Sequence, residues 1–205
     1  MARPKEQTVR RGEIVAAAQR AIVARGLAGL RIKDIAREAG LSPGSVSYYY
    51  REFDDLLADV HQDALDRFYW ARLRAIEAAP DPAAQLTALV RAGVPATADD
   101  RLSRVLYELH VHAARSRVHA ALMTALYDRE VSLYQRVLAG GRERGVFALD
   151  PAAVDEVAAN AVALEDAYGL HVVGRNAHVS PDLARTNILA YLTLATGVAL
   201  AAAKG

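Results

Sequence analysis

Apolar residues recur along this chain every three or four positions, which is the period of helices that bury one face. Ile14, Ala18 and Ile22 lie on one such stripe, and Gly26 follows it as a helix-ending residue. No segment combines the strict alternation of a half-buried strand with turn residues. The pattern therefore predicts an all-α fold.

Proline, glycine or short polar segments separate the predicted helices. The helices are expected over residues 6–25, 32–39, 43–50, 54–79, 82–94, 100–115, 117–144, 152–173 and 182–203. We expect the first three to pack together as a compact head over residues 1–51. The remaining helices are expected to form a larger helical body over residues 52–205, giving about nine helices in all.

Residues 32–51 carry the features of a helix-turn-helix. Gly40 stands at the turn, where a backbone with positive φ favours glycine. Ser42 and Pro43 then form a helix start, with a serine N-cap and proline at the first helical position. Together these features predict that the head is a DNA-binding domain and that helix 43–50 lies in the major groove of a duplex.

The side chains expected to face DNA lie on the third helix and beside it. The predicted DNA-binding residues are Arg31, Lys33, Pro43, Gly44, Ser45, Ser47, Tyr48, Tyr49 and Arg51. Gly44 would permit a close backbone approach, and Tyr48 is the aromatic residue best placed for a phosphate or a thymine methyl group. Tyr50 is expected in the core. Arg10 and Arg11 either contact phosphates or lie at a solvated helix end.

Charge is distributed unevenly along the chain. Residues 1–51 contain ten Lys or Arg and four Asp or Glu, a net charge of +6, whereas residues 52–205 contain fifteen and twenty, a net charge of −5. A basic head on an acidic body is what a phosphate-binding domain would show. Chance clustering on a solvated surface is the alternative, and the asymmetry matters because it coincides with the helix-turn-helix.

A series of short segments in the first quarter of the chain resembles a known family. They are Arg11-Gly-Glu-Ile14, Arg25-Gly-Leu27, Ile32-Lys-Asp-Ile-Ala36, Ala39-Gly-Leu-Ser42, Gly44-Ser-Val-Ser-Tyr-Tyr-Tyr50 and Asp54-Asp-Leu-Leu57. In this order and spacing they resemble the N-terminal pattern of TetR/AcrR-type transcriptional regulators. The resemblance implies a homodimer that binds a double-stranded DNA operator. It also implies a ligand-binding and dimerisation body and repression that an unknown small-molecule effector relieves.

Three positions depart from that family pattern. Arg31 stands where a serine or threonine usually opens the second helix, so the backbone donors there are expected to lose a cap. Ser47 stands where tyrosine is common, and Phe53 stands where the family usually has a lysine. These changes bear on the operator sequence more than on the function.

The last two predicted helices are unusually apolar, and the final one is apolar on nearly every face. We therefore predict that they pair with their twofold mates in a four-helix dimer interface. The predicted interface residues are Val157, Ala161, Leu164, Ile188, Tyr191, Leu192, Ala195 and Val198. A large core within a single subunit is the alternative.

Bulky and polar residues of the body form the candidate effector site. They are Phe68, Trp70, Tyr107, His110, Tyr127, Tyr134, Glu165 and Tyr168. Taken singly, each is more readily explained as an ordinary core or surface residue. Glu165 and Asp166 are more telling because they interrupt an apolar run.

Several other kinds of chemistry are not expected from this chain. It contains no cysteine, which excludes disulfides and thiolate metal sites. His110 and His112 are two positions apart and so face different sides of a helix, and we expect no metal and no cofactor. The N-terminus does not resemble a signal peptide and no membrane span is expected, so we predict a cytoplasmic protein.

Two alternatives to a ligand-responsive repressor remain at this point. One is a helix-turn-helix regulator that has no small-molecule effector. The other is a small all-helical enzyme, but no nucleophile–base pair, phosphate-binding loop or metal-ligand spacing is visible in the sequence. We therefore expect binding activity and no catalysis.

Overall fold

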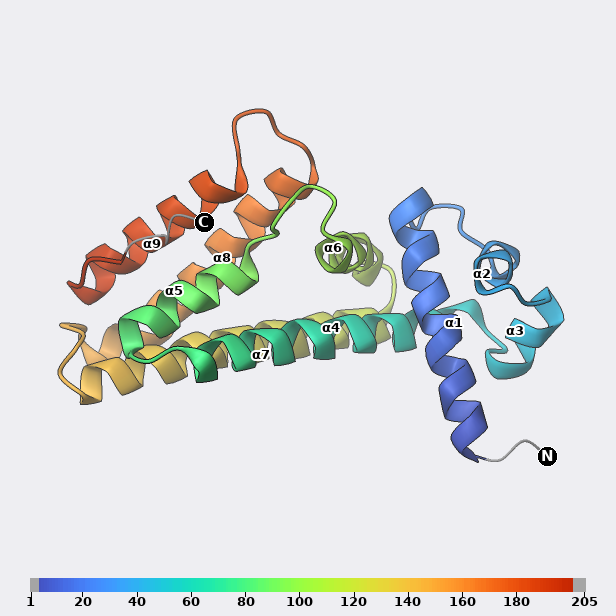
Figure 1. Ribbon diagram of the computed structural model, residues 1–205, viewed down its shortest axis with the longest axis horizontal. Coiled ribbons are helices and arrows are strands. Elements are labelled where there is room, and N and C mark those ends of the chain that lie inside the picture. The colour runs from blue at the N-terminus through green and yellow to red at the C-terminus, as the bar shows by residue number, and fades with distance from the viewer. Residues whose placement is uncertain (1–3, 201–205) are drawn as a thin grey trace. The chain divides into compact units, whose positions relative to one another are not determined.

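Helices make up most of the part of the chain that the structure describes, residues 4–200 (Figure 1). No strand occurs among those residues of the computed structural model, so the predicted all-α fold is confirmed. The helices are α1 (Pro4–Arg25), α2 (Ile32–Ala39), α3 (Pro43–Tyr49), α4 (Phe53–Ala78), α5 (Pro82–Gly93), α6 (Arg101–Ala113), α7 (Arg117–Glu143), α8 (Val154–Val173) and α9 (Pro181–Thr196). A short 3-10 turn, η1 (Pro151–Ala153), precedes α8.

The end of the last helix differs most from the prediction. A helix was expected over residues 182–203, but α9 ends at Thr196. Gly197 adopts a left-handed conformation with φ 70°, and its N–H donates to the Thr193 carbonyl at 2.9 Å, which ends the helix. Positions 201–203 of the predicted helix lie outside the described residues.

The described residues form two compact units. The first comprises the residues up to Asp66 together with Arg101–Met123, and the second comprises Arg67–Asp100 and the residues from Thr124 onward. Helices α4 and α7 each contribute to both units, and all of α6 belongs to the first. The boundary between the compact units therefore does not coincide with residue 51. The division into a DNA-binding domain over residues 1–51 and a ligand-binding and dimerisation body over residues 52–205 stays a prediction.

The core of the first unit explains why it extends beyond the three N-terminal helices. Ile14 of α1, Ile35 of α2 and Val46 of α3 are fully buried. Helix α6 packs against α1, and Glu108 of α6 accepts a hydrogen bond from the Leu27 backbone N–H at 2.8 Å. Because α6 covers α1, it belongs to the same unit as the head.

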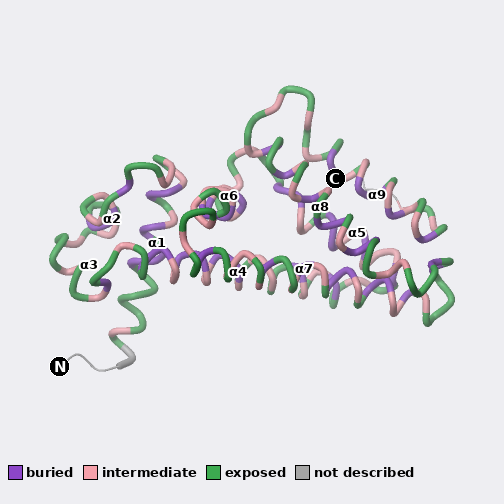
Figure 2. Tube along the Cα trace, turned by 180° about the vertical axis from the view of Figure 1, so that it is seen from behind, coloured by how far each residue is buried: buried purple, intermediate pink, exposed green. Residues whose placement is uncertain are grey.

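The second unit is a helical bundle built mainly on the α8–α9 pair. Helices α8 and α9 pack side by side, and α5 packs on α9. Leu86, Val162, Ile188 and Leu192 are fully buried in this core, and buried positions recur along each helix (Figure 2). Among the described residues, no helix is both long enough and apolar enough to span a membrane.

Candidate DNA-binding surface and buried polar cluster

Backbone features that the sequence predicted form the helix-turn-helix. Gly40 follows α2 in a left-handed conformation with φ 66°, and the Leu41 N–H donates to the Ala36 carbonyl at 2.8 Å. The Ser42 Oγ then accepts a hydrogen bond from the Ser45 N–H at 3.0 Å and caps α3. These bonds fix the direction in which α3 leaves α2.

Helix α3 has one buried side and one open side. Val46 is fully buried, and Tyr50, the residue after the helix, is 1% exposed, as the sequence predicted. On the open side Tyr48 is 70% exposed. Its ring lies edge to face against Tyr49, with ring centroids 5.1 Å apart. The open side therefore offers aromatic surface to an external partner.

A surface hollow of about 530 Å³ lies beside the open side of α3. It is lined by Arg10, Leu41, Ser42, Gly44, Ser45, Tyr48 and Tyr49. A Cβ added at Gly44 would meet only the Ser42 Oγ, at 3.9 Å, so the protein itself leaves this backbone accessible. The Ser45 hydroxyl is hydrogen bonded to the Ser42 Oγ at 2.8 Å, whereas Ser47 is exposed.

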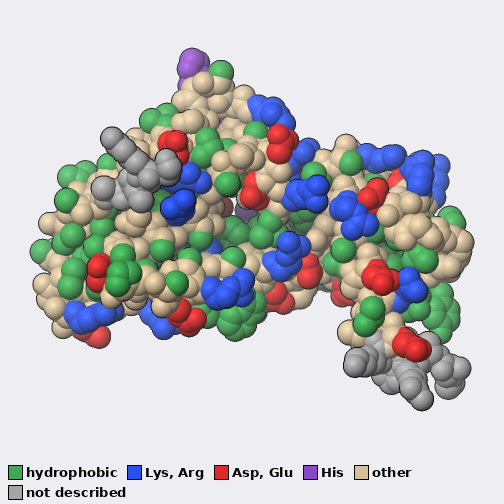
Figure 3. All heavy atoms as spheres, viewed as in Figure 1, with side chains coloured by type: hydrophobic (Ala, Val, Ile, Leu, Met, Phe, Trp, Pro, Cys, Tyr) green, Lys and Arg blue, Asp and Glu red, His purple; other side chains and the backbone are tan. Residues whose placement is uncertain are grey.

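Cationic side chains also lie on the helix-turn-helix. Figure 3 shows Lys and Arg side chains gathered over α2, the helix before α3. Arg31, Lys33 and Arg51 are all exposed, as expected for phosphate contacts. Arg31, in place of serine or threonine, was expected to leave the start of α2 without a side-chain cap. Part of the capping is restored, because the Asp34 Oδ2 accepts a hydrogen bond from the Arg31 backbone N–H at 3.2 Å.

Arg10 and Arg11 have different environments. The Arg11 Nη2 donates to the Asp59 Oδ2 at 2.8 Å, and its guanidinium lies 4.4 Å from the centroid of the Tyr50 ring. Burial and then a hydrogen bond to Asp59 raise the pKa of Tyr50. The hydrogen bond to Asp59 also raises the pKa of Arg11. Arg11 thus ties α1 to α4, while Arg10 lines the hollow.

The structure divides the predicted effector-site residues between the two compact units. Tyr107 and His110 belong to the first unit, and the other six belong to the second. Trp70 is 51% exposed and Tyr127 is 43% exposed, because they lie outside the buried stripes of α4 and α7, and their assignment to the effector site stays a prediction. The Tyr168 hydroxyl accepts a hydrogen bond from α9.

Arg72 of α4 is the centre of a buried polar cluster in the second unit. Its Nη1 donates to the Glu165 Oε2 at 2.7 Å and, less closely, to the Glu130 Oε1 at 3.4 Å. The Tyr134 hydroxyl donates to the Glu165 Oε1 at 2.6 Å. The guanidinium carbon lies 5.2 Å from the centroid of the Phe68 ring. Three of the predicted residues, Phe68, Tyr134 and Glu165, therefore meet around Arg72.

Burial and charge oppose each other in this cluster. Burial lowers the pKa of Arg72, but the acidic side chains of Glu165 and Glu130 raise it by more, so the guanidinium stays charged. Burial raises the pKa of Glu130 to about 8, against the opposing effect of Arg72. Burial also raises the pKa of Glu165, but Arg72 and the hydrogen bond from Tyr134 favour its charged form. The closer ion pair is Arg72–Glu165.

Two nitrogen atoms of the Arg72 guanidinium lack a hydrogen-bond acceptor among the described residues. Its Nε and Nη2 are buried without a hydrogen-bond partner among the described residues. Gly93 of α5 covers the ion pair, since a Cβ added there would overlap the Arg72 Nη1 and the Glu165 Oε1. The free donors suit an oxygen acceptor such as a carbonyl or a carboxylate.

Arg72 and Glu130 were not among the predicted site residues. Arg72 stands four positions after Phe68 and four before Ile76, so it falls on the inward-facing stripe of α4. A charged residue at a core position implies a buried partner, and this was the available signal.

Half of the predicted dimer-interface residues belong to the core of the subunit. Val157, Ala161, Ile188 and Leu192 are at most 7% exposed, so they do not offer side chains to a second copy and their assignment is corrected. The reason is that α8 and α9 bury these sides against each other and against neighbouring helices. The other four predicted residues are partly exposed; they are Leu164, Tyr191, Ala195 and Val198.

A different apolar face of α8 and α9 is exposed. Leu170 of α8 is 56% exposed, and Leu183 and Leu194 of α9 are 42% and 86% exposed. Ala167 and Ala190 are also exposed on these two helices. Large exposed leucines next to small residues are typical of a helix-packing surface.

Comparisons with known proteins bear on this geometry. Residues 14–60 match the family model for bacterial regulatory proteins of the tetR family. The HTH-type transcriptional repressor KstR2 of Mycolicibacterium smegmatis is 27% identical over 105 residues, which are 51% of this chain and 51% of that protein. The HTH-type transcriptional regulator BetI of Burkholderia ambifaria is 35% identical over 86 residues, which are 41% of this chain and 44% of that protein. The matches therefore span about half the length of these curated relatives.

A solved structure extends the likeness over most of the chain. It is a transcriptional regulator from Saccharomonospora viridis in complex with choline, with a TM-score of 0.82 and 23% sequence identity. The match covers 90% of this chain and 96% of that one. At this identity the likeness shows a shared fold.

Proposed function

We propose that this chain is a regulator of the tetR type, whose family model residues 14–60 match, and that it is a homodimeric repressor that releases its operator when a small molecule binds the body. The observation that carries the proposal is the open side of α3. There Tyr48 is 70% exposed and the backbone at Gly44 is accessible. The proposed activity is binding, with no catalysis.

In the proposed complex, α3 enters the major groove of the operator. Ser47 and Tyr48 meet base edges or thymine methyl groups, and Gly44 lets the backbone approach closely. Arg31 and Lys33 contact phosphates, which orients the head and makes the affinity fall with rising salt. The further contacts proposed on or beside α3 are Pro43, Ser45, Tyr49 and Arg51.

We propose that the homodimer forms through the exposed apolar face of α8 and α9. Leu194 is 86% exposed in the single subunit, and covering it with a second copy removes that apolar surface from water. Ala167 and Ala190 would allow the paired helices to approach closely. The two heads of such a dimer would contact half-sites about 34–36 Å apart, or a multiple of that spacing.

The Arg72 cluster is the proposed effector site. The buried Nε and Nη2 of Arg72 are donors that an oxygen of the effector would satisfy. The choline-bound structure has the same fold, which supports a small-molecule effector here without identifying it. The effector must prefer the DNA-free state, and the coupling is typically ~1–3 kcal/mol.

Selection of duplexes from a random pool by the full chain, followed by gel shifts on the recovered sequence, tests this proposal. We expect a palindromic site, and we expect Tyr48→Ala and Lys33→Ala each to weaken its binding at least tenfold while the dimer stays folded. Arg136→Ala, an exposed charge on α7, is the matched control and should leave the affinity unchanged.

Recovery of no sequence, or equal losses in all three variants, would overturn the DNA-binding mode. A metabolite screen on the same gel shift tests the effector. A regulator without an effector would hold the duplex under every metabolite, whereas the proposed repressor is released by at least one.

A further inference from the structure

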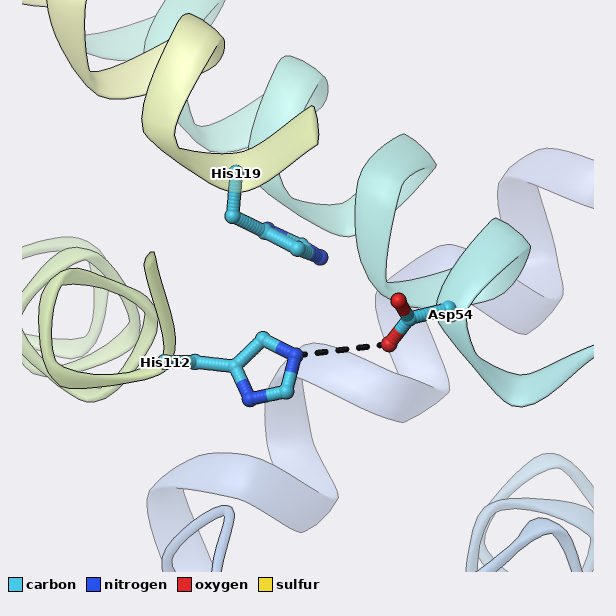
Figure 4. Close-up of side chains that lie close together, drawn as sticks. All are labelled: Asp54, His112 and His119. Carbon is cyan, nitrogen blue, oxygen red and sulfur yellow. Dashed lines mark hydrogen bonds and ion pairs between the residues drawn. The ribbon is translucent and has the colours of Figure 1, made fainter. Parts of the chain in front are cut away.

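Three side chains of the first compact unit bring possible metal ligands together. Asp54 of α4, His112 of α6 and His119 of α7 each offer one oxygen or ring nitrogen, and these atoms all lie within 4.8 Å of one another. The side chains converge on one point from three helices (Figure 4). Because Asp54 lies 58 positions before His112 in the sequence, the fold itself assembles the group.

The spacing within this group is close to that of a metal site. The His112 Nε2 lies 3.3 Å from the Asp54 Oδ1. Ligand atoms that bind a tetrahedral zinc ion at about 2.0–2.2 Å lie about 3.4 Å from one another, so this pair already has the required separation. The rings of His112 and His119 lie edge to face with centroids 4.8 Å apart. Zinc binding would require the ligand atoms, which lie within 4.8 Å of one another, to move somewhat closer, and the side chains of Asp54 and His112 can rotate to allow this.

His119 is held by another histidine. It is fully buried, and its Nδ1 lies 3.1 Å from the Nδ1 of His61 with the two rings stacked. One of these nitrogens donates and the other accepts, which leaves the His119 Nε2 for a different partner. That Nε2 is buried and has no hydrogen-bond partner among residues 4–200. In Figure 4 a ring nitrogen of His119 points toward Asp54 and His112.

We propose that Asp54, His112 and His119 bind a divalent transition-metal ion, for which zinc is the best match, and that His61 orients His119. Two imidazoles and one carboxylate suit zinc rather than calcium or magnesium, which prefer all-oxygen sites. A metal-bound histidine whose other ring nitrogen is hydrogen bonded is the usual arrangement in such sites. Three protein ligands leave a fourth position for water or an anion.

The proposed ion has a route from solvent and would join three helices. The Asp54 side chain is 61% exposed and that of His112 is 26% exposed, so an ion can reach them. Bound metal would tie the first turn of α4 to α6 and α7 within the unit that contains the helix-turn-helix. Zinc at about 100 times its Kd should therefore raise the melting temperature by about 5–10 °C.

Titration of the metal-stripped, tag-free full chain with zinc by calorimetry, and with cobalt by visible absorption, tests the proposal. We expect one ion per chain and the strong visible band of four-coordinate cobalt. His112→Ala and Asp54→Asn should each weaken zinc binding at least tenfold and remove the cobalt band. His178→Ala, an exposed histidine between α8 and α9, is the matched control and should change neither.

The test uses Asp54, which is exposed, and His112, which is partly exposed, because substitution of the buried His119 would also remove core packing. Circular dichroism of each variant checks that it is folded. Absence of zinc binding at micromolar concentrations would overturn the proposal, as would unchanged affinity in His112→Ala and Asp54→Asn. An equal loss in His178→Ala would place the ion elsewhere and would also overturn it. DNA binding by a chain that binds no zinc would reject this site while leaving the proposed repressor intact.

Discussion

The buried carboxyl of Glu130 is expected to make this protein less stable as the pH rises. Burial raises the pKa of Glu130 to about 8, from an ordinary value of 4.5. A carboxyl with a raised pKa binds its proton more tightly in the folded state than in the unfolded state. Its contribution to stability is therefore complete below about pH 4.5 and is lost as the pH rises through about 8.

The size of this effect follows from the two pKa values. The interval between 4.5 and about 8 corresponds to about 5 kcal/mol of unfolding free energy, at ~1.36 kcal/mol per pH unit. Relaxation of the surroundings around the ionised carboxyl reduces that figure, so we expect roughly 2–5 kcal/mol. Glu130→Gln keeps the shape of the side chain and cannot ionise. The unfolding free energy of Glu130→Gln should equal that of the wild type near pH 5. At pH 9 it should be higher than that of the wild type by roughly 2–5 kcal/mol.

Urea unfolding followed by far-ultraviolet circular dichroism at pH 5, 7 and 9 measures the difference. Glu143→Gln is the matched control, because it makes the same chemical change at an exposed position of the same helix, α7. The other charged groups that influence the Glu130 pKa are unchanged by Glu130→Gln; they are Arg72, Glu165 and Asp166.

Two results would refute this reasoning. One is a pH dependence of unfolding that is the same in the wild type and in Glu130→Gln. The other is a Glu130→Gln variant that is less stable than the wild type at pH 9. Either would mean that the carboxyl is not kept protonated by its burial.

Three further predictions concern packing and binding. Gly44→Ala has room for the added methyl group, so its unfolding free energy should stay within about 1 kcal/mol of that of the wild type in chemical unfolding. Operator binding, measured by fluorescence anisotropy, should become at least tenfold weaker. Full affinity would contradict the close approach of the Gly44 backbone to DNA. Leu194→Arg should give monomers in light scattering, and an intact dimer would exclude the proposed face. Gly93→Ala should cost roughly 2–4 kcal/mol in urea unfolding because its methyl group overlaps the Arg72–Glu165 pair, and a neutral result would argue against that packing.

The helix-turn-helix was predictable because its determinants act on neighbouring residues. Gly40 sets the turn through its own backbone conformation, and Ser42 caps α3 through a bond to a residue three positions away. Tyr50, directly after α3, was also expected in the core and is buried. Such local rules place a helix and its open side without knowledge of the rest of the fold.

The body was harder to predict because its contacts join distant residues. Arg72 meets Glu130 58 positions away and Glu165 93 positions away, and periodicity marks a position as buried without naming its partner. Val157 was assigned to a second copy for the same reason, although it fills the subunit's own core. The spacing of two positions places His110 and His112 on different sides of a helix, but sequence spacing does not identify Asp54, 58 positions away, as a neighbour of His112.

Site-specific cross-linking tests most directly whether α3 enters the major groove. The chain contains no cysteine, so Ser47→Cys places a single thiol on the open side of α3. The account predicts a disulfide between this thiol and a thiol-tethered base in the major groove of each selected half-site. It predicts none from Thr186→Cys, an exposed position on α9. Cross-linking from Thr186→Cys alone, or from neither variant, would contradict the account.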